Sequence, residues 1–356
     1  MGIHEVAARF FTDQLAGSWV PQYLTGRGFG PHVQRQWQAG YAPATRDGLA
    51  RHLRAAGYAD SLIVAAGLAR RSRRGYLTDT FRDRAVLPIR SARGSMVAFI
   101  GRSAEHATRD SPRYLNSPRT FRYEKGRTLF GLWEARESLA AGAIPVIVEG
   151  PLDVLAVALA GGGRFAPVSP CGTALTSQQA QALDRTGGLA KSGVLVAFDG
   201  DDSGSRAAVR AYRVLSPYLA GSQLARLPAG SDPASLLGDG GPPALAAALT
   251  HRTRPLADVV VDTELANWRC WLEFAEGKVS ALRAIAPMIA VMPAGDVGRQ
   301  VGRLAVTLGL PHPVVTEAVT DALSGDSGSG SGAMAAGKVR VTASPCGGVE
   351  VAATAP

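Results

Sequence analysis

Cysteine is scarce in this 356-residue chain, and long apolar runs are missing. The three cysteines, Cys171, Cys270 and Cys346, are too far apart for a disulfide framework or for the paired spacing of a zinc site, so we expect no zinc. Apolar runs such as residues 143–148 are far shorter than the roughly 20 residues of a membrane span, and the first residues lack a basic and then apolar signal sequence. We therefore expect a soluble cytoplasmic protein that does not contact membranes.

The composition is that of a folded protein with real cores. Hydrophobic residues make up 46% and charged residues 19% of the chain, which is typical of globular domains and excludes wholesale disorder. Because domains commonly hold roughly 100 to 200 residues, this length predicts two or three packed units.

Positive charge is concentrated in the first third of the chain. The formal net charge is +9, and residues 1–137 hold 22 basic against 11 acidic residues. Only 4 of the 38 basic residues are lysine. A GC-rich genome could explain that choice of arginine, but not the clustering. A basic region of this kind favours a nucleic-acid partner, because arginine and lysine contacts with phosphates release counterions.

Changes in sequence pattern divide the chain into four regions. Short helical patterns fill residues 1–65, and residues 84–90 and 95–102 predict a hairpin around the turn at 91–94. Between residues 145 and 237, apolar strands alternate with helical stretches, which predicts βαβ units and a mostly parallel sheet. We expect a mixed α/β fold with a basic α+β subdomain over 1–137, an α/β subdomain over 138–245, a helical subdomain over 246–323 and a disordered tail over 324–356.

Acidic residues follow two of the expected parallel strands. Glu149 ends the strand at 146–148, and Asp153 lies in the first turn of the next helix. Asp199 and Asp201 follow the strand at 194–198. Because the carboxyl ends of parallel strands share one sheet edge, these acids are expected to gather in one crevice and to bind Mg²⁺. Taken singly, an Asp-x-Asp is common in surface loops, and Asp153 or Asp202 could merely favour a helix N-terminus.

These segments resemble the TOPRIM domain of bacterial DnaG-type DNA primases. The resemblance rests on VEGPLDVLA (148–156), SPCGTALT (169–176), FDGDDSGSRAA (198–208) and LPAGSDPASLL (227–237). Residues 84–102 and 112–132 resemble the basic RNA-polymerase subdomain of these primases, which TOPRIM topoisomerases and nucleases lack. With the similar segments 23–30 and 39–43, the likeness covers about residues 5–245.

The resemblance implies a DNA primase that makes short RNA primers on single-stranded DNA from ribonucleoside triphosphates, using Mg²⁺ or Mn²⁺. It implies that Glu149, Asp199 and Asp201 are the essential acids, with Asp153 and Asp232 as further metal ligands. Contacts to the template strand, the RNA–DNA duplex or the incoming nucleotide are implied for a basic track made of Arg84, Arg90, Arg102, Arg113, Asn116, Lys125 and Arg127. A turn-forming role is an equal alternative for Asn116, and any one arginine could be a solvated surface group.

The chain also departs from the family pattern. Ala234 stands where the family usually has a second acid, which is expected to weaken one metal position, and Pro151 replaces a usual aromatic residue. The N-terminal zinc-binding domain of the family is expected to be absent, so a separate zinc-finger protein or a replicative helicase would guide the enzyme to its start site. Two rival functions are a non-catalytic, primase-derived replication protein of a mobile element and another TOPRIM enzyme, a nuclease or topoisomerase.

Overall fold

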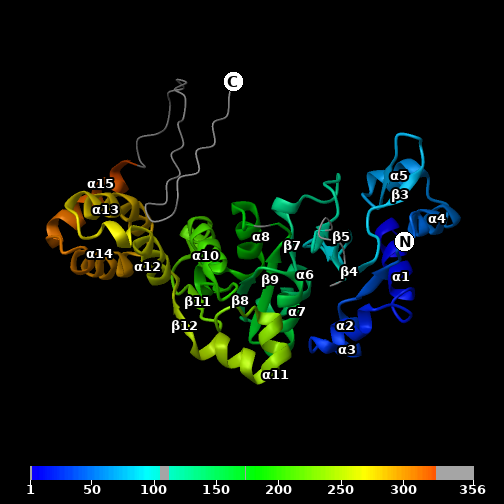
Figure 1. The fold of residues 1–356 in the computed structure, drawn as a ribbon, viewed down its shortest axis with the longest axis horizontal. Helices are drawn as coiled ribbons and strands as arrows, with labels where there is room; N and C mark the ends of the chain where they lie inside the picture. Colours follow the sequence, from blue (N-terminus) through cyan, green and yellow to red (C-terminus); the bar gives the residue numbers. More distant parts are fainter. Residues whose placement is uncertain (1, 105–111, 173, 326–356) are drawn as a thin grey trace.

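Three parts of the chain follow one another along the longest axis of the molecule (Figure 1). The computed structural model describes residues 2–104, 112–172 and 174–325. The expected tail beyond residue 325 and Thr173 of the SPCGTALT segment lie outside the described residues. The first part carries a four-stranded sheet, the central part a six-stranded sheet, and the last part is helical. The mixed α/β fold expected from the sequence is confirmed.

The N-terminal part packs short helices around an antiparallel sheet. Its helices are α1 (Ile3–Asp13), α2 (Val20–Gly26), α3 (Pro31–Gln36), α4 (Gly48–Ala55) and α5 (Asp60–Ala65). Strands β1 (Gly40–Ala42), β4 (Arg84–Arg90), β5 (Met96–Ser103) and β6 (Tyr114–Asn116) form the sheet, while β2 (Ala69–Arg71) and β3 (Leu77–Asp79) pair separately. The expected hairpin is confirmed, because β4 and β5 pair antiparallel around a turn in which Gly94 has a φ of 87°. The 3₁₀ turn η1 (Lys125–Arg127) follows β6.

The central sheet has the strand order β12-β11-β10-β8-β9-β7. Strands β8 (Ile144–Val148), β9 (Phe165–Pro170), β10 (Leu195–Ala197) and β11 (Gln223–Ala225) run parallel, as the alternating pattern predicts. The edge strands β7 (Leu129–Phe130) and β12 (Thr253–Pro255) run antiparallel to their neighbours. From β9 the chain crosses to the other side of β8, so the sheet has a switch point between β8 and β10, the place where open α/β sheets bind ligands.

Helices connect the strands of the central sheet. They are α6 (Leu132–Ala140), α7 (Pro151–Ala160), α8 (Ser177–Gly187), α9 (Leu189–Ser192), α10 (Asp202–Leu215) and α11 (Pro233–His251), with the 3₁₀ turn η2 (Ser216–Tyr218) after α10. Helix α6 spans the expected division after residue 137, and α11 spans the one after residue 245. Edge strands β7 and β12 therefore bring segments from beyond both divisions into the central sheet.

The C-terminal part is a group of helices that continues the core of the central part. It contains α12 (Leu256–Trp268), the 3₁₀ turn η3 (Arg269–Trp271), α13 (Ala275–Ala290), α14 (Ala294–Leu308) and α15 (His312–Gly325). Buried apolar residues of α10 and α12 to α15 belong to one cluster, and the Tyr212 hydroxyl donates to the Met288 carbonyl at 2.8 Å. Across the described residues, no helix is both long enough and apolar enough to cross a membrane.

Candidate active site

Glu149 and Asp199 follow adjacent strands at the switch point of the central sheet. Val148, the last residue of β8, pairs with Ala197, the last residue of β10. The next turns bring the two acids together, and the Asp199 backbone N–H donates to Glu149 Oε1 at 3.2 Å. The structure therefore joins these acids at one sheet edge, as the parallel-strand argument predicts.

Two further aspartates begin helices beside this pair. Asp201 Oδ1 accepts the Gly204 N–H at 2.8 Å at the start of α10, and Asp232 Oδ1 accepts the Ser235 N–H at 2.6 Å at the start of α11. Helix N-termini carry unsatisfied N–H groups and a partial positive charge, so they hold carboxylates at defined positions. Within the described residues, each aspartate accepts its cap hydrogen bond through Oδ1 alone, which leaves Oδ2 for a ligand.

Asp153 has a different environment. It is buried at the start of α7, where its Oδ2 accepts the Gly150 N–H at 2.9 Å and its Oδ1 accepts the Ala234 N–H at 3.2 Å. These bonds tie the loop after β8 to the first turn of α11. Both oxygens are thus engaged by backbone donors, and the role of Asp153 as a metal ligand stays a prediction.

Burial, together with neighbouring carboxylates, raises the pKa of three acids at this site. Burial, followed by the Asp232 and Asp199 charges, raises the pKa of Asp153 to about 8. Burial, then Glu149, Asp232 and Asp201, raises the pKa of Asp199 to about 6, while Arg113 opposes the shift. Burial also raises the pKa of Glu149. Without a neutralising partner the site therefore repels further negative charge, and a cation would relieve this repulsion.

The chemistry of these donors fits a hard divalent cation, because every candidate ligand is a carboxylate oxygen. Within residues 2–104, 112–172 and 174–325, however, no three Asp, Glu, His or Cys side chains are arranged to hold a metal ion. The arrangement fits a hard divalent cation bound by one or two carboxylates, with water and phosphate oxygens completing the coordination, rather than a cage made by the protein alone.

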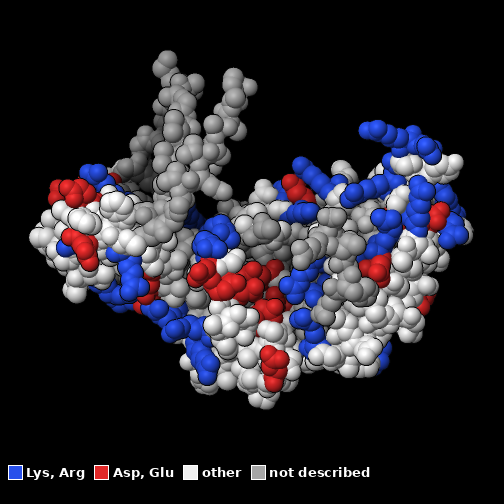
Figure 2. All heavy atoms as spheres, viewed as in Figure 1, with Lys and Arg blue, Asp and Glu red and all other residues white. Residues whose placement is uncertain are grey.

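A cavity of about 550 Å³ between the N-terminal and central parts places these acids opposite basic groups. Four predicted acids and three members of the predicted basic track line it, namely Glu149, Asp153, Asp199, Asp232, Arg113, Asn116 and Lys125. Asp201 stands outside that lining, at the start of α10. Figure 2 shows acidic side chains gathered over the middle of one face of the molecule, with basic side chains on both sides of them.

Asn116 connects the N-terminal sheet to the central part. It pairs with Ile100 within the sheet, and its Nδ2 donates to the Cys171 carbonyl at 2.8 Å. Its buried Oδ1 has no hydrogen-bond partner among the described residues. The side chain thus bridges two parts of the chain instead of shaping a local turn, and its contact with a nucleotide stays a prediction.

Two arginines of the predicted track bond to other groups of the protein. Arg84 is buried, and its guanidinium donates to the carbonyls of Gly101 at 3.3 Å and Pro112 at 2.8 Å. Arg90 forms an ion pair with Glu134 at 3.2 Å. Neither residue lines the cavity, so their proposed contact with nucleic acid depends on surfaces away from the acids.

Arg102 and Arg127 also lie outside the cavity lining. The buried Arg102 guanidinium lies 4.7 Å from the ring centre of Tyr23 and 5.6 Å from that of Tyr114, which are distances typical of cation–π contacts. Arg127 is exposed and lies 3.9 Å from Glu124. Arg102 thus packs within the protein, whereas Arg127 faces solvent.

Arg27, Ser203 and Arg210 are among the residues that line the cavity without having been predicted from the sequence. Ser203 and Arg210 lie seven positions apart on α10, a spacing that places two residues on one helix face. Arg210 opposes the rise in the pKa of Glu149, so its charge acts on the acid pair. The seven-residue spacing along the helix that follows Asp201 is the sequence signal by which both α10 residues could have been found.

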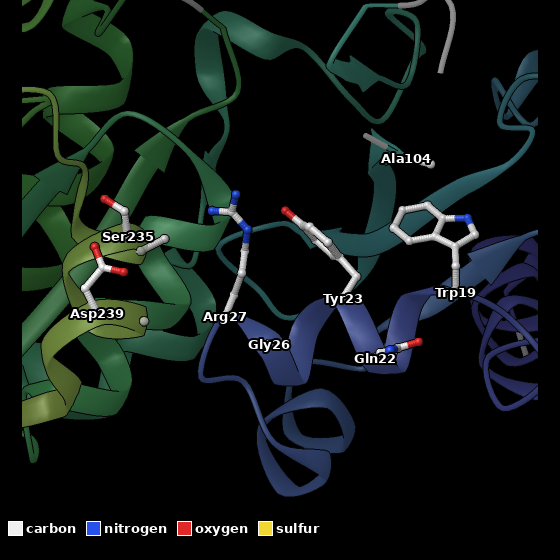
Figure 3. Close-up of a pocket in the computed structure, with 10 residues that line it drawn as sticks. Trp19, Gln22, Tyr23, Gly26, Arg27, Ala104, Ser235 and Asp239 are labelled. Atoms are coloured by element: carbon white, nitrogen blue, oxygen red, sulfur yellow. The ribbon is translucent and has the colours of Figure 1, made fainter. Parts of the chain in front are cut away.

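Arg27 also lines a second pocket, of about 570 Å³, between α2 and α11. Figure 3 shows Tyr23 projecting from α2 and Arg27 from the residue directly after it, with Ser235 and Asp239 projecting from α11 on the other side. Arg27 and Ala234 line both hollows, so the second pocket adjoins the cavity that holds the acids.

Comparisons with known proteins agree with this architecture. A family model described as "DNA primase catalytic core, N-terminal domain" matches residues 10–136, and one described as "Toprim-like" matches residues 146–237. The DNA primase of Mycolicibacterium smegmatis is 35% identical over 296 residues, which cover 82% of this chain and 46% of that protein. This chain thus spans about half the length of the curated relatives it matches.

Solved structures give the same result. The RNA polymerase domain of the Mycobacterium tuberculosis primase DnaG is 31% identical, with a TM-score of 0.74, and the match covers 86% of this chain and 97% of that domain. A DnaG primase catalytic domain bound to single-stranded DNA is 28% identical, with a TM-score of 0.71, over 86% of this chain and 97% of that one. The chain therefore belongs to the family of DnaG-type DNA primases, whose catalytic core it matches along most of its length.

Proposed function

We propose that this chain is a nucleotidyltransferase that copies single-stranded DNA into short RNA primers. The observation that carries the proposal is the cavity in which the Glu149 and Asp199 pair faces Arg113 and Lys125. Phosphoryl transfer needs this combination of acids for a metal and cations for phosphates. The single-stranded DNA bound by the related DnaG catalytic domain supports the same template for this chain.

The proposed reaction joins two nucleotides. A 3′-hydroxyl attacks the α-phosphate of a ribonucleoside triphosphate, a new phosphodiester bond forms, and pyrophosphate leaves. Glu149, whose raised pKa suits a proton acceptor, takes the hydroxyl proton directly or through water. Arg113, Lys125 and Arg210 line the same cavity and would neutralise the triphosphate.

Asp199 and Asp201 would hold the metal, with Glu149, Asp153 and Asp232 as further ligands in our proposal. When bound, Mg²⁺ or Mn²⁺ supplies charge neutralisation of the triphosphate oxygens and acidifies the attacking hydroxyl. Among these acids, Asp199 is the strongest candidate, since it lines the cavity and uses only its backbone N–H to bond Glu149. The RNA–DNA duplex made by the reaction would lie along the exposed basic residues of the N-terminal part, in the cytoplasm where replication proteins work.

The proposal is tested by template-dependent RNA synthesis. The purified chain, single-stranded DNA, ribonucleoside triphosphates and Mg²⁺ should give short RNA products, and Asp199→Asn should give none while it still binds DNA. Glu273→Gln removes an exposed acid outside the cavity and should leave synthesis unchanged. A wild-type chain that binds DNA without making RNA would instead support the non-catalytic rival, and cleavage or relaxation of supercoiled DNA would support the nuclease or topoisomerase.

A further inference from the structure

Phe121 is the most exposed large apolar side chain in the described part of the chain. Its side chain is fully exposed, with a relative accessibility of 105%, and it lies in the sequence between Thr120 and Arg122. A fully solvated phenylalanine contributes nothing to the core and loses the free energy that its burial would supply. The exposed ring is therefore accessible to a ligand that would cover it.

The backbone around Phe121 is held in place on both sides. Thr120 N–H donates to the Tyr123 carbonyl at 2.9 Å, and the Thr120 hydroxyl accepts the Tyr123 N–H at 3.1 Å. Tyr123 itself is buried, with 1% of its surface exposed. Further along, Gln179 Nε2 donates to the carbonyls of Lys125 and Thr128, each at 2.8 Å. The tight turn thus anchors Tyr123 in the core and presents Phe121 to solvent.

Cations surround the exposed ring. Residues 119–127 contain four basic side chains and one acidic side chain. Glu124 lies 3.4 Å from Arg119 and 3.9 Å from Arg127, so one carboxylate is shared by two arginines. Both arginines are more than half exposed, at which exposure such pairs contribute little free energy. A surface hollow lined by Arg119, Phe121, Arg122 and Arg127 therefore keeps a net positive charge.

We propose that this hollow binds an unpaired base of single-stranded DNA, which stacks on Phe121 while the arginines contact the adjoining phosphates. Aromatic rings and arginines in this arrangement are the common elements of single-strand binding surfaces. Lys125 belongs to the same segment and lines the catalytic cavity, so residues 119–127 contribute side chains to both the hollow and the cavity. The site deepens the proposed function, because the strand it holds is the template of that reaction.

Equilibrium binding to a fluorescein-labelled oligothymidylate tests the site. Phe121→Ala should weaken binding about tenfold, the loss of one stacked base. Phe121→Trp should bind as the wild type does, and Phe121→Leu should bind as weakly as the alanine variant, because leucine is apolar but has no aromatic face. Phe274→Ala removes another exposed phenylalanine, 55% accessible and at the start of α13, and should leave binding unchanged.

Salt dependence separates stacking from charge. Phe121→Ala should lower the affinity without altering the slope of log K against log[salt], whereas Arg122→Ala should reduce that slope by about 0.7. The inference is wrong if Phe121→Ala binds the oligonucleotide as tightly as the wild type, or if Phe121→Leu restores binding. Either of these two contradicting outcomes would leave the proposed function intact as long as the wild type makes primers. That function fails separately if the wild type binds the strand and makes no RNA.

Discussion

Buried carboxylates show how single residues position helices in this protein. Asp79 is buried, and its two oxygens accept the backbone N–H groups of Leu49 at 2.8 Å and Ala50 at 3.0 Å, at the start of α4. Asp153 does the same for Gly150 and Ala234 at the site. In both cases the hydrogen bonds hold the carboxylate where a helix begins, but burial penalises its charge.

Asp79 should make stability depend on pH. Burial raises the pKa of Asp79 from 3.8 to about 6, so the folded chain keeps this proton at pH values where the unfolded chain has lost it. The contribution of Asp79 to stability therefore falls as the pH rises from about 4 to about 6 and is constant above that window. In urea unfolding at several pH values, Asp79→Asn should gain stability relative to the wild type across this range. A difference that does not vary between pH 4 and pH 7 would contradict the assignment.

At the scale of elements, the first turn of α10 packs so closely against the segment after β10 that position 204 has room only for glycine. A Cβ at Gly204 would lie 2.1 Å from the Asp199 carbonyl oxygen, and the Gly204 N–H is the donor that Asp201 caps. The contacts of Gly204 thus hold the first turn of α10 against Asp199 and Asp201, which sets the positions of both acids.

Gly204→Ala should therefore destabilise the fold by about 1 to 3 kcal/mol and displace Asp199, although alanine normally favours helices. Gly302 offers the matched control, because it lies inside α14 and a Cβ there meets no atom within 4 Å. Gly302→Ala should stabilise the chain by up to about 1 kcal/mol. Thermal unfolding of both variants checks the contrast, and equal effects of the two substitutions would show that the close approach at Gly204 carries no cost.

Elements were also the level at which the sequence was most informative. Alternating apolar patterns correctly predict the β4–β5 hairpin and the parallel strands, because each depends on local periodicity and turn chemistry. The meeting of Glu149 and Asp199 follows from the rule that parallel strands end at one edge. The partners of the arginines could not be predicted in this way. Arg84 donates hydrogen bonds to backbone carbonyls whereas Arg113 lines the cavity, although the sequence predicts one basic track for both. Such differences depend on which parts pack together, and local spacing does not contain that information.

At the scale of the whole molecule, the candidate site exists only where two parts meet. The acids come from the central sheet, whereas Arg113, Asn116 and Lys125 precede that sheet in sequence and reach the cavity from the N-terminal part. Of the basic residues in 1–137, Arg27, Arg113 and Lys125 thereby line the same cavity as the carboxylates of the central part. Binding of single-stranded DNA and the chemical step should then be separable by mutation, because the N-terminal part supplies these cations and the central part supplies the acids.

Arg113→Ala and Lys125→Ala should each weaken single-stranded DNA binding and reduce its dependence on salt. Each neutralised phosphate contributes about 0.7 to the slope of log K against log[salt] for a single strand. Arg283→Ala removes an exposed arginine from α13, outside the cavity, and should change neither quantity. Slopes that stay at the wild-type value in both cavity variants would show that these cations do not contact phosphates.

In this proposal the acids Glu149 and Asp199, which follow β8 and β10, perform the chemistry, whereas other residues bind the single-stranded DNA. Glu149→Gln tests it most directly, because glutamine keeps an oxygen for the Asp199 N–H but cannot take up the hydroxyl proton. Primer synthesis and single-stranded DNA affinity should be measured on the same preparation. We predict that synthesis falls by at least about 100-fold while the affinity equals that of the wild type; primer synthesis by Glu149→Gln at the wild-type rate would contradict the account.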